Sequence, residues 1–353
     1  MKNILFASTA LVAFGGAAAA DVAISGSAEI GIFGGKTAAG ATTEMQFHTD
    51  IDVNFSMSGE TDNGLSFGAS IDLDETDGSD STCTFVDTDT DTDGTAPATA
   101  GSTQTCAVDG GANAFDADKQ GGETYFVAFG NARLDMGDTD GAFDAAMIEV
   151  NLVGGSINDA ETAHAGFNGN AGLDGTFDGQ IARFSYTTAG FTGHASVELD
   201  DSGAGDAVFG LGVRYGTDLG GATVNVGAGY QSTNSATGAA NTGRTIWGVS
   251  ASAAMTNGLQ AGVNYSVQSR DAWAADAKHT AIGVGYTMNN IGLGLNWGQT
   301  DGAGGVAGAK ESGWGLAATY DLGGGMVAQF GYGDNTTSGD QGNSYSLGLA
   351  MSF

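Results

Sequence analysis

Residues 343–353 read Asn-Ser-Tyr-Ser-Leu-Gly-Leu-Ala-Met-Ser-Phe, and this stretch decides the fold class. Large apolar side chains occupy every second position, and small or polar side chains occupy the positions between them. Since successive side chains of a strand point to opposite faces, one face is apolar and the other is small and polar. A face in bulk water would carry charges, and this one carries none. The pattern is typical of a membrane β-barrel strand whose second face lines a crowded, wet interior.

The same alternation recurs along the chain in segments of about ten residues. It is clear in residues 258–268 and again in residues 291–298. After the first twenty residues, no apolar run approaches the length of about 20 residues that a membrane helix needs. The sequence predicts sixteen strands, near 22–33, 44–58, 64–74, 122–130, 131–137, 180–188, 190–200, 206–217, 221–231, 243–255, 258–269, 278–288, 291–300, 311–321, 325–334 and 343–353. The number is even, as a closed bacterial barrel requires.

The predicted connections alternate in length. Short turns such as 189–190, 256–258 and 289–290 contain the Gly and Asn that hairpins favour. Longer polar loops fall between them, and the largest are 75–121 and 138–179. With both termini in the periplasm, every short turn lies there and every long loop lies outside. A closed antiparallel barrel also leaves no unpaired backbone in lipid, so an all-β transmembrane barrel is the predicted fold class.

The first twenty residues have the composition of a cleaved signal peptide. Lys2 supplies a positive start, residues 4–14 are apolar, and residues 18–20 are alanines suited to cleavage. We therefore expect residues 21–353 to form a single barrel domain after export. The chain contains 62 Gly and 1 Pro, which fits strands that exclude proline. Its net charge of −31 excludes nucleic-acid binding, which needs clusters of Lys and Arg.

The sequence resembles the general porins of the Gram-negative outer membrane, particularly the alphaproteobacterial type. The resemblance is carried by residues 20–26, where the signal joins the first strand, and by the terminal strand that ends in Phe353. It covers the whole chain from residue 21 onward. It implies a homotrimer in outer-membrane lipid and lipopolysaccharide, which passes ions and small polar solutes by passive diffusion. It also implies that the barrel-assembly machinery recognises the terminal strand through Phe353.

The resemblance further implies a third external loop that folds into the lumen as a constriction. The strand count makes this loop 138–179, which contains acids but no Lys or Arg. The predicted constriction acids are Asp138, Asp140, Asp144, Glu149, Asp159 and Glu161. Family members set basic wall residues against such a loop, and the candidates here are Arg183, Arg133, Arg214 and Arg244. Because the acids outnumber the arginines, we expect the channel to prefer cations.

The loop 75–121 contains both cysteines of the chain and an acidic repeat. In an exported protein, Cys83 and Cys106 are expected to form a disulfide. The repeat between them presents carboxylates at alternate positions, at Asp87, Asp89, Asp91 and Asp93. Oxygen ligands suit calcium, but the spacing is not that of an EF-hand. A solvated acidic loop tip, a structural calcium site and divalent bridging to lipopolysaccharide stay open, and no other cofactor is predicted.

Three functions other than general diffusion are known for exported β-barrels, and each makes a demand on the sequence. A substrate-specific channel stays open, because solute preference depends on how the constriction loop folds. An outer-membrane barrel hydrolase needs a Ser/His/acid site, and the chain has no Gly-x-Ser-x-Gly element. An adhesin or anchor barrel would show fewer strands or an attached soluble domain, and the sequence shows neither. We therefore predict a channel and not an enzyme.

Overall fold

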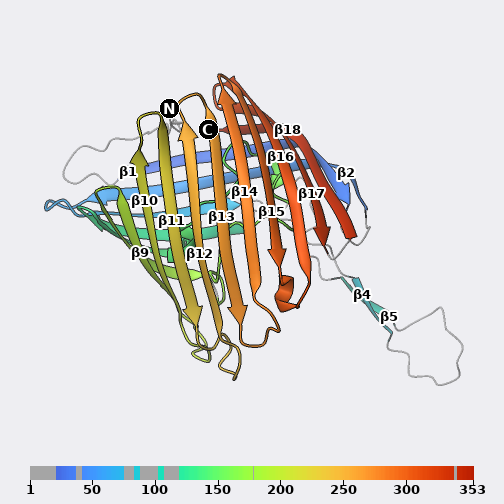
Figure 1. Ribbon diagram of the computed structural model, residues 1–353, viewed down its shortest axis with the longest axis horizontal. Coiled ribbons are helices and arrows are strands. Elements are labelled where there is room, and N and C mark those ends of the chain that lie inside the picture. The colour runs from blue at the N-terminus through green and yellow to red at the C-terminus, as the bar shows by residue number, and fades with distance from the viewer. Residues whose placement is uncertain are drawn as a thin grey trace, which may run out of the picture. The chain divides into compact units, whose positions relative to one another are not determined.

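The computed structural model describes residues 21–36, 42–74, 83–87, 102–106, 119–177, 179–337 and 340–353. Sixteen of the described strands close into one antiparallel barrel, in which consecutive strands are neighbours (Figure 1). They are β1 (Asp21–Lys36), β2 (Thr42–Glu60), β3 (Ser66–Asp74), β6 (Lys119–Phe129), β7 (Ala132–Asp138), β8 (Gln180–Thr188), β9 (Phe191–Glu198), β10 (Val208–Asp218), β11 (Ala222–Thr233), β12 (Arg244–Met255), β13 (Leu259–Arg270), β14 (Ala277–Met288), β15 (Ile291–Asp301), β16 (Lys310–Gly323), β17 (Met326–Thr337) and β18 (Asp340–Ser352).

The predicted strands are confirmed, and their ends differ from the prediction by three residues at most. The barrel closes where β18 pairs with β1, with Leu349 opposite Ile30. Phe353 extends this pairing, since its backbone N donates to the Gly26 carbonyl at 2.9 Å. Closure leaves no free edge in the barrel sheet, so its backbone polar groups are paired where lipid would surround it.

The two faces of the wall differ as the alternation predicts. Along β14, Ile282 and Val284 are 49% and 48% exposed, whereas the alternate Ala281 and Gly283 are buried. The strand register also places aromatic residues opposite one another on the exposed face, such as Trp297 opposite Trp314. Exposed apolar side chains with flanking aromatics are the normal outer surface of a membrane barrel. The small, polar face is therefore the inner one.

Short helical turns occur only outside the strands within the described part of the chain. These are α1 (Ala142–Ala146), η1 (Ile157–Asp159) and η2 (Ala303–Gly305). No described helix has the length and apolar character needed to cross a membrane.

A separate compact unit spans residues 73–121. It contains a two-stranded hairpin of β4 (Cys83–Asp87) and β5 (Ser102–Cys106), a region that the sequence reasoning treated as loop. The register places Cys83 directly opposite Cys106. Directly opposite residues in an antiparallel pair have Cα atoms about 4.5 to 5.5 Å apart, within the range for a disulfide.

Candidate pore and its constriction

The segment between β7 and β8 lies along the inner face of the wall. On its outward course, the Ala142 N donates to the Ser196 Oγ of β9 and the Ile148 N donates to the Ser250 Oγ of β12, both at 2.9 Å. Asn264 of β13 then donates through Nδ2 to the Ile148 carbonyl. These contacts all involve the face opposite to the exposed apolar side chains, so this segment, called the constriction loop below, is inside the barrel.

The constriction loop returns along the same wall. Asn296 of β15 donates through Nδ2 to the Glu161 carbonyl and contacts His164 Nε2 through its Oδ1 at 2.6 Å. Further along, the Leu173 N donates to the Gln231 Oε1 of β11 at 2.8 Å. Apolar packing supports these bonds, since Phe143, Met147, Leu173, Val208 and Ile246 form one buried cluster between loop and wall.

Inner-face glycines let the loop backbone approach the wall closely. A Cβ atom at Gly212, Gly283 or Gly294 would overlap a loop carbonyl oxygen, that of Ala142, Val150 or Val153 respectively. A Cβ at Gly315 would overlap the Glu161 carbonyl in the same way. The glycines at alternate positions of these strands therefore form the surface on which the constriction loop packs. The sequence alone indicated only that they belong to a small face lining a wet lumen.

The tip of the constriction loop contacts the seam where the barrel closes. Ile157 is fully buried, and its side chain lies over Gly31 of β1 and Gly348 of β18. The Glu29 carboxylate accepts bonds from the Asn158 N at 3.3 Å and from His48 Nε2 at 3.1 Å. The loop therefore spans the inner wall from β9 to β1.

The predicted constriction acids are not equivalent in the structure. Asp138, Asp140, Glu149 and Asp159 are exposed, and Asp144 is partly buried. Glu161 is only 1% exposed and accepts bonds from the Ser156 hydroxyl and the Asn151 amide. Its carboxylate therefore binds other residues of the same loop and does not line an open passage.

Burial changes the ionisation of the loop acids. Desolvation raises the pKa of Asp144 to about 7, and the nearby carboxylates of Asp140, Asp174 and Glu149 add to the rise. Burial also raises the pKa of Asp174 to about 6, although the Gly141 N donates to its carboxylate at 2.7 Å. The pKa of Glu149 is raised by the same desolvation. The negative charge of this loop therefore depends on pH near neutrality.

Two of the predicted wall arginines converge on a carboxylate that sequence reasoning missed. Asp135 of β7 is 7% exposed and lies directly opposite Arg183 of β8. Its Oδ1 is 2.7 Å from Arg133 Nη2, and its Oδ2 is 3.5 Å from Arg183 Nη2. Arg183 also donates through Nη1 to the Asp140 carbonyl at 2.8 Å. The alternate positions of Arg133 and Asp135 in the sequence were the available signal for this cluster.

The other two predicted arginines lie elsewhere on the wall. Arg214 of β10 is opposite Thr192 and Gly227. Arg244 begins β12 and lies opposite Arg270 of β13, which the sequence reasoning did not single out. The structure therefore brings Arg133 and Arg183 together but leaves Arg214 and Arg244 apart from them in strand order.

A second acidic row, on the wall itself, also escaped the sequence reasoning. Glu29 of β1 is opposite Asp50 of β2, and Ser27 is opposite Asp52 and donates to its Oδ2 at 3.0 Å. These acids share the inner face, because they alternate with the exposed Ile51. The available signal in the sequence was the spacing of two residues between Asp50 and Asp52, which places both on one face of a strand.

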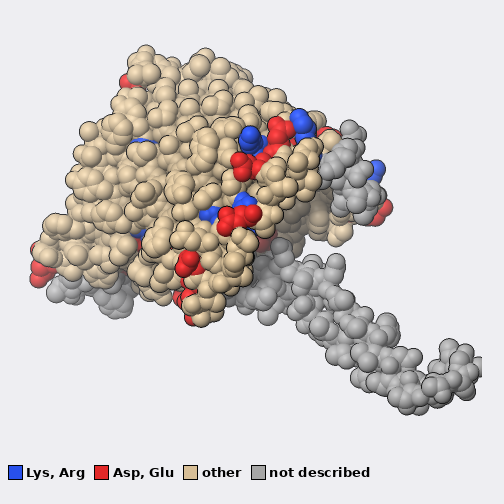
Figure 2. All heavy atoms as spheres, turned by 60° about the horizontal axis from the view of Figure 1, so that its bottom comes forward, with Lys and Arg blue, Asp and Glu red and all other residues tan. Residues whose placement is uncertain are grey.

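The charged side chains on one face of the molecule are few. Figure 2 shows that the larger basic patches on this face lie beside acidic ones. Lys310 Nζ and Asp301 Oδ1, which are 3.0 Å apart, form an exposed ion pair.

Several predicted sites lie partly or wholly beyond the described residues. Asp89, Asp91 and Asp93 are outside them, and only the backbone of Asp87 is described. Among the described residues, no group of three or more His, Cys, Asp or Glu side chains is placed to hold a metal ion. The calcium site therefore stays a prediction.

One serine–histidine contact bears on the hydrolase alternative. Ser185 Oγ and His194 Nδ1 are 2.9 Å apart across β8 and β9. A hydrolytic triad also needs a carboxylate bonded to the second ring nitrogen of the histidine. The nearby Asp135 carboxylate is instead paired with the two arginines.

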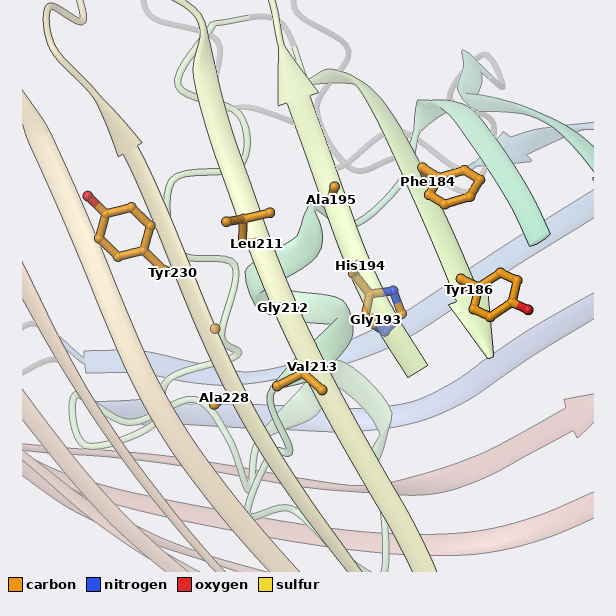
Figure 3. A pocket seen from close by; sticks show the side chains of 11 residues that line it. Phe184, Tyr186, Gly193, His194, Ala195, Leu211, Gly212, Val213, Ala228 and Tyr230 are labelled. Atoms are coloured by element: carbon orange, nitrogen blue, oxygen red, sulfur yellow. The ribbon is translucent and has the colours of Figure 1, made fainter. Parts of the chain in front are cut away.

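The outer face carries a groove that is distinct from the interior. Gly193 and Ala195 of β9 form its floor, between Phe184 and Tyr186 on one side and Leu211 on the other (Figure 3). Its volume is about 530 Å³. Since its large side chains belong to the exposed apolar face, the groove faces the surroundings of the barrel and is not part of the pore.

Comparison with known proteins agrees with this architecture. The model of the family described as Gram-negative porin matches residues 7–340. Solved structures of Rhodopseudomonas blastica porin variants are similar, including a triple mutant at TM-score 0.61 and 16% identity and a second variant at 0.61 and 15%. Each match covers 94% of this chain and 100% of the other chain. No curated protein matches the chain. The family match spans nearly the whole sequence, and the chain therefore belongs to the Gram-negative porin family.

Proposed function

We propose that this outer-membrane porin is a passive aqueous channel for ions and small hydrophilic solutes, and that it prefers cations. The observation that carries the preference is the position of Asp135 between Arg133 and Arg183. Arg133 and Arg183, which would repel cations, are both bound to this carboxylate. Arg183 also lies 3.8 Å from a second carboxylate, that of Asp140.

The course of the constriction loop supports a passage on one side of the barrel. Its contacts with the wall run from β9 to β18 and β1. The passage then lies between the loop and the inner faces of β2, β3, β6, β7 and β8. Both of its sides carry acids: Glu149 and Asp159 on the loop, and Asp50 and Asp52 of β2 on the wall.

The size of the effect depends on ionic strength. At 0.1 M salt, charges act over about 10 Å, whereas at 1 M they act over about 3 Å. Carboxylates along a narrow passage therefore favour cations at low salt, and this preference weakens at high salt.

The protein's partners follow from the proposed function. We expect a homotrimer in outer-membrane lipid, with lipopolysaccharide around its outer end and the barrel-assembly machinery as the factor that inserts it. Family membership and the many exposed apolar side chains on the outer face of the described barrel support these expectations.

Planar bilayers test the channel itself. Purified protein should insert in discrete conductance steps, and liposomes that contain it should swell in small sugars faster than in large ones. Protein that inserts as heat-modifiable barrels but gives neither steps nor swelling would contradict a diffusion channel.

A further inference from the structure

Two arginines face each other at the end of the barrel where the longer connecting loops lie, called the loop end below. They are separate from the cluster around Asp135. Arg244 is the first residue of β12, Arg270 is the last residue of β13, and the two are register partners. Arg244 shares the inner face with the buried Ile246, and Arg270 shares it with the buried Ser266. Since Ile246 packs against the constriction loop, the pair lies between that loop and the end of the barrel.

The pair is not neutralised by acids in the described part of the chain. Like charges directly opposite each other in an antiparallel sheet are destabilising. No ion pair joins either arginine to a described acid, although Asp271 and Asp276 are near in sequence. The Asp271 carboxylate accepts a bond from the Gly243 N at 3.2 Å, and the Asp276 carboxylate accepts one from the Ser269 hydroxyl at 2.7 Å.

The guanidinium of Arg270 is held in a fixed orientation. Its Cζ lies 4.7 Å from the centre of the Trp273 ring, which is a cation–π contact. Its Nε is buried and has no hydrogen-bond partner. A planar guanidinium donates two parallel bonds to a phosphate or a carboxylate, and a stacked aromatic ring leaves its edge available for them.

We propose that Arg244 and Arg270 bind an oxyanion, such as the phosphate or carboxylate group of a solute, at the mouth of the pore. The ligand would supply the negative charge that this pair lacks and accept bonds from the available edges of the two guanidinium groups. An anionic group that enters from the loop end would reach this site before the constriction. The inference requires an accessible barrel interior but does not depend on cation preference.

Binding of inorganic phosphate to the purified, detergent-solubilised protein tests the site without ion conduction. At low ionic strength, the phosphorus resonance should broaden with wild-type protein. Arg244→Ala and Arg270→Ala should each weaken phosphate binding roughly tenfold, which corresponds to about 1.4 kcal/mol, because each removes a charged hydrogen-bond donor. Arg270→Lys keeps the positive charge but lacks the two parallel donors of the guanidinium, and should bind phosphate with intermediate affinity. Acetate should displace phosphate if the site accepts carboxylates as well.

Lys278→Ala is the matched control, since Lys278 is exposed on the opposite face of the adjacent β14 and should not affect binding. Heat-modifiable migration of each variant shows that its barrel has formed. In bilayers, phosphate added to the loop side should lower the conductance of wild-type channels and not of Arg270→Ala channels. Two results would overturn the proposal: no broadening with folded wild-type protein, or broadening with both alanine variants as large as with the wild type. Neither result bears on the sign of ion selectivity.

Discussion

Asp135 and Arg183 face each other across β7 and β8, and their charged groups are 3.5 Å apart on the inner wall. Arg133 binds the other oxygen of the same carboxylate at 2.7 Å. One buried acid therefore offsets two arginines of the wall. We predict that Asp135→Asn exposes passing ions to both positive charges and shifts the zero-current potential in a salt gradient toward anions.

Asp159→Asn is the control for this prediction, because it removes the same charge from an exposed loop position with no described ion pair. Its shift should be smaller than that of Asp135→Asn. Equal shifts in the two variants, both with wild-type heat-modifiable migration, would show that Asp135 has no special role.

Selectivity should depend on pH through Asp144. Burial raises its pKa from 3.8 to about 7, so lowering the pH from 8 to 6 adds a proton and removes a negative charge from the constriction loop. The cation preference should weaken over this interval, and Asp144→Asn should flatten the profile. Zero-current potentials at half-unit pH steps provide the measurement, and a variant with the full wild-type profile would refute the assignment.

The same shift has a consequence for stability. Between pH 4 and pH 7 the folded protein binds a proton at Asp144 that the unfolded chain, with the ordinary pKa of 3.8, releases. Stability from this group is therefore lost as the pH rises through that window. Thermal unfolding should show a pH slope that is smaller in Asp144→Asn than in the wild type.

Because the constriction loop packs directly on inner-face glycines, enlarging one of these glycines should change the pore size. Gly283→Ala places a Cβ onto the Val150 carbonyl, and overpacking of this kind costs about 1 to 3 kcal/mol. The constriction loop should move off the wall, and the single-channel conductance should change. Gly193→Ala is the matched control, since its Cβ would meet nothing within 4 Å on the outer face. Identical conductance in both variants and the wild type would contradict the proposed course of the loop.

The cysteines should be oxidised in the exported protein. Their backbone positions are directly opposite in the β4–β5 hairpin, and the bridge would contribute about 3 kcal/mol by loop entropy. Alkylation under denaturing, non-reducing conditions should leave the mass unchanged until a reductant is added. Reduction should not alter heat-modifiable migration, because β4 and β5 pair only with each other. Two alkylated thiols before reduction would disprove the disulfide.

Assembly should depend on the terminal aromatic ring. Phe353 is 69% exposed, and its backbone, not its ring, makes the described bonds to Gly26. Phe353→Asp keeps those bonds but places a charge at the exposed end of the strand that we propose the assembly machinery recognises, so its surface yield should fall. Phe353→Tyr should assemble normally. Equal yields of the two variants would show that the ring is not the signal.

Strands and topology were predictable from the sequence because apolar side chains alternate with small or polar ones, and this alternation shows which face of the strand each residue occupies. The alternation of Ile291, Leu293 and Leu295 with small residues is a local signal, and local signals suffice for a barrel whose consecutive strands pair. The phase of this alternation also indicated which residues face inward, including Arg183.

The course of the constriction loop was less accessible, because its contacts join residues far apart in the sequence. Burial of Glu161 depends on Ser156, Asn151 and the wall beneath, and no local pattern separates it from the exposed Asp159. The pairing of Asp135 with two arginines required the register between β7 and β8, which short-range periodicity does not set.

The most direct test of cation preference is the zero-current potential of wild-type protein in a planar bilayer across a tenfold potassium chloride gradient. At pH 8 and about 0.1 M salt, where charges act over roughly 10 Å, the dilute side should become positive, because potassium crosses more readily than chloride. The potential should shrink as the salt approaches 1 M. A dilute side that becomes negative would show chloride preference and contradict the account.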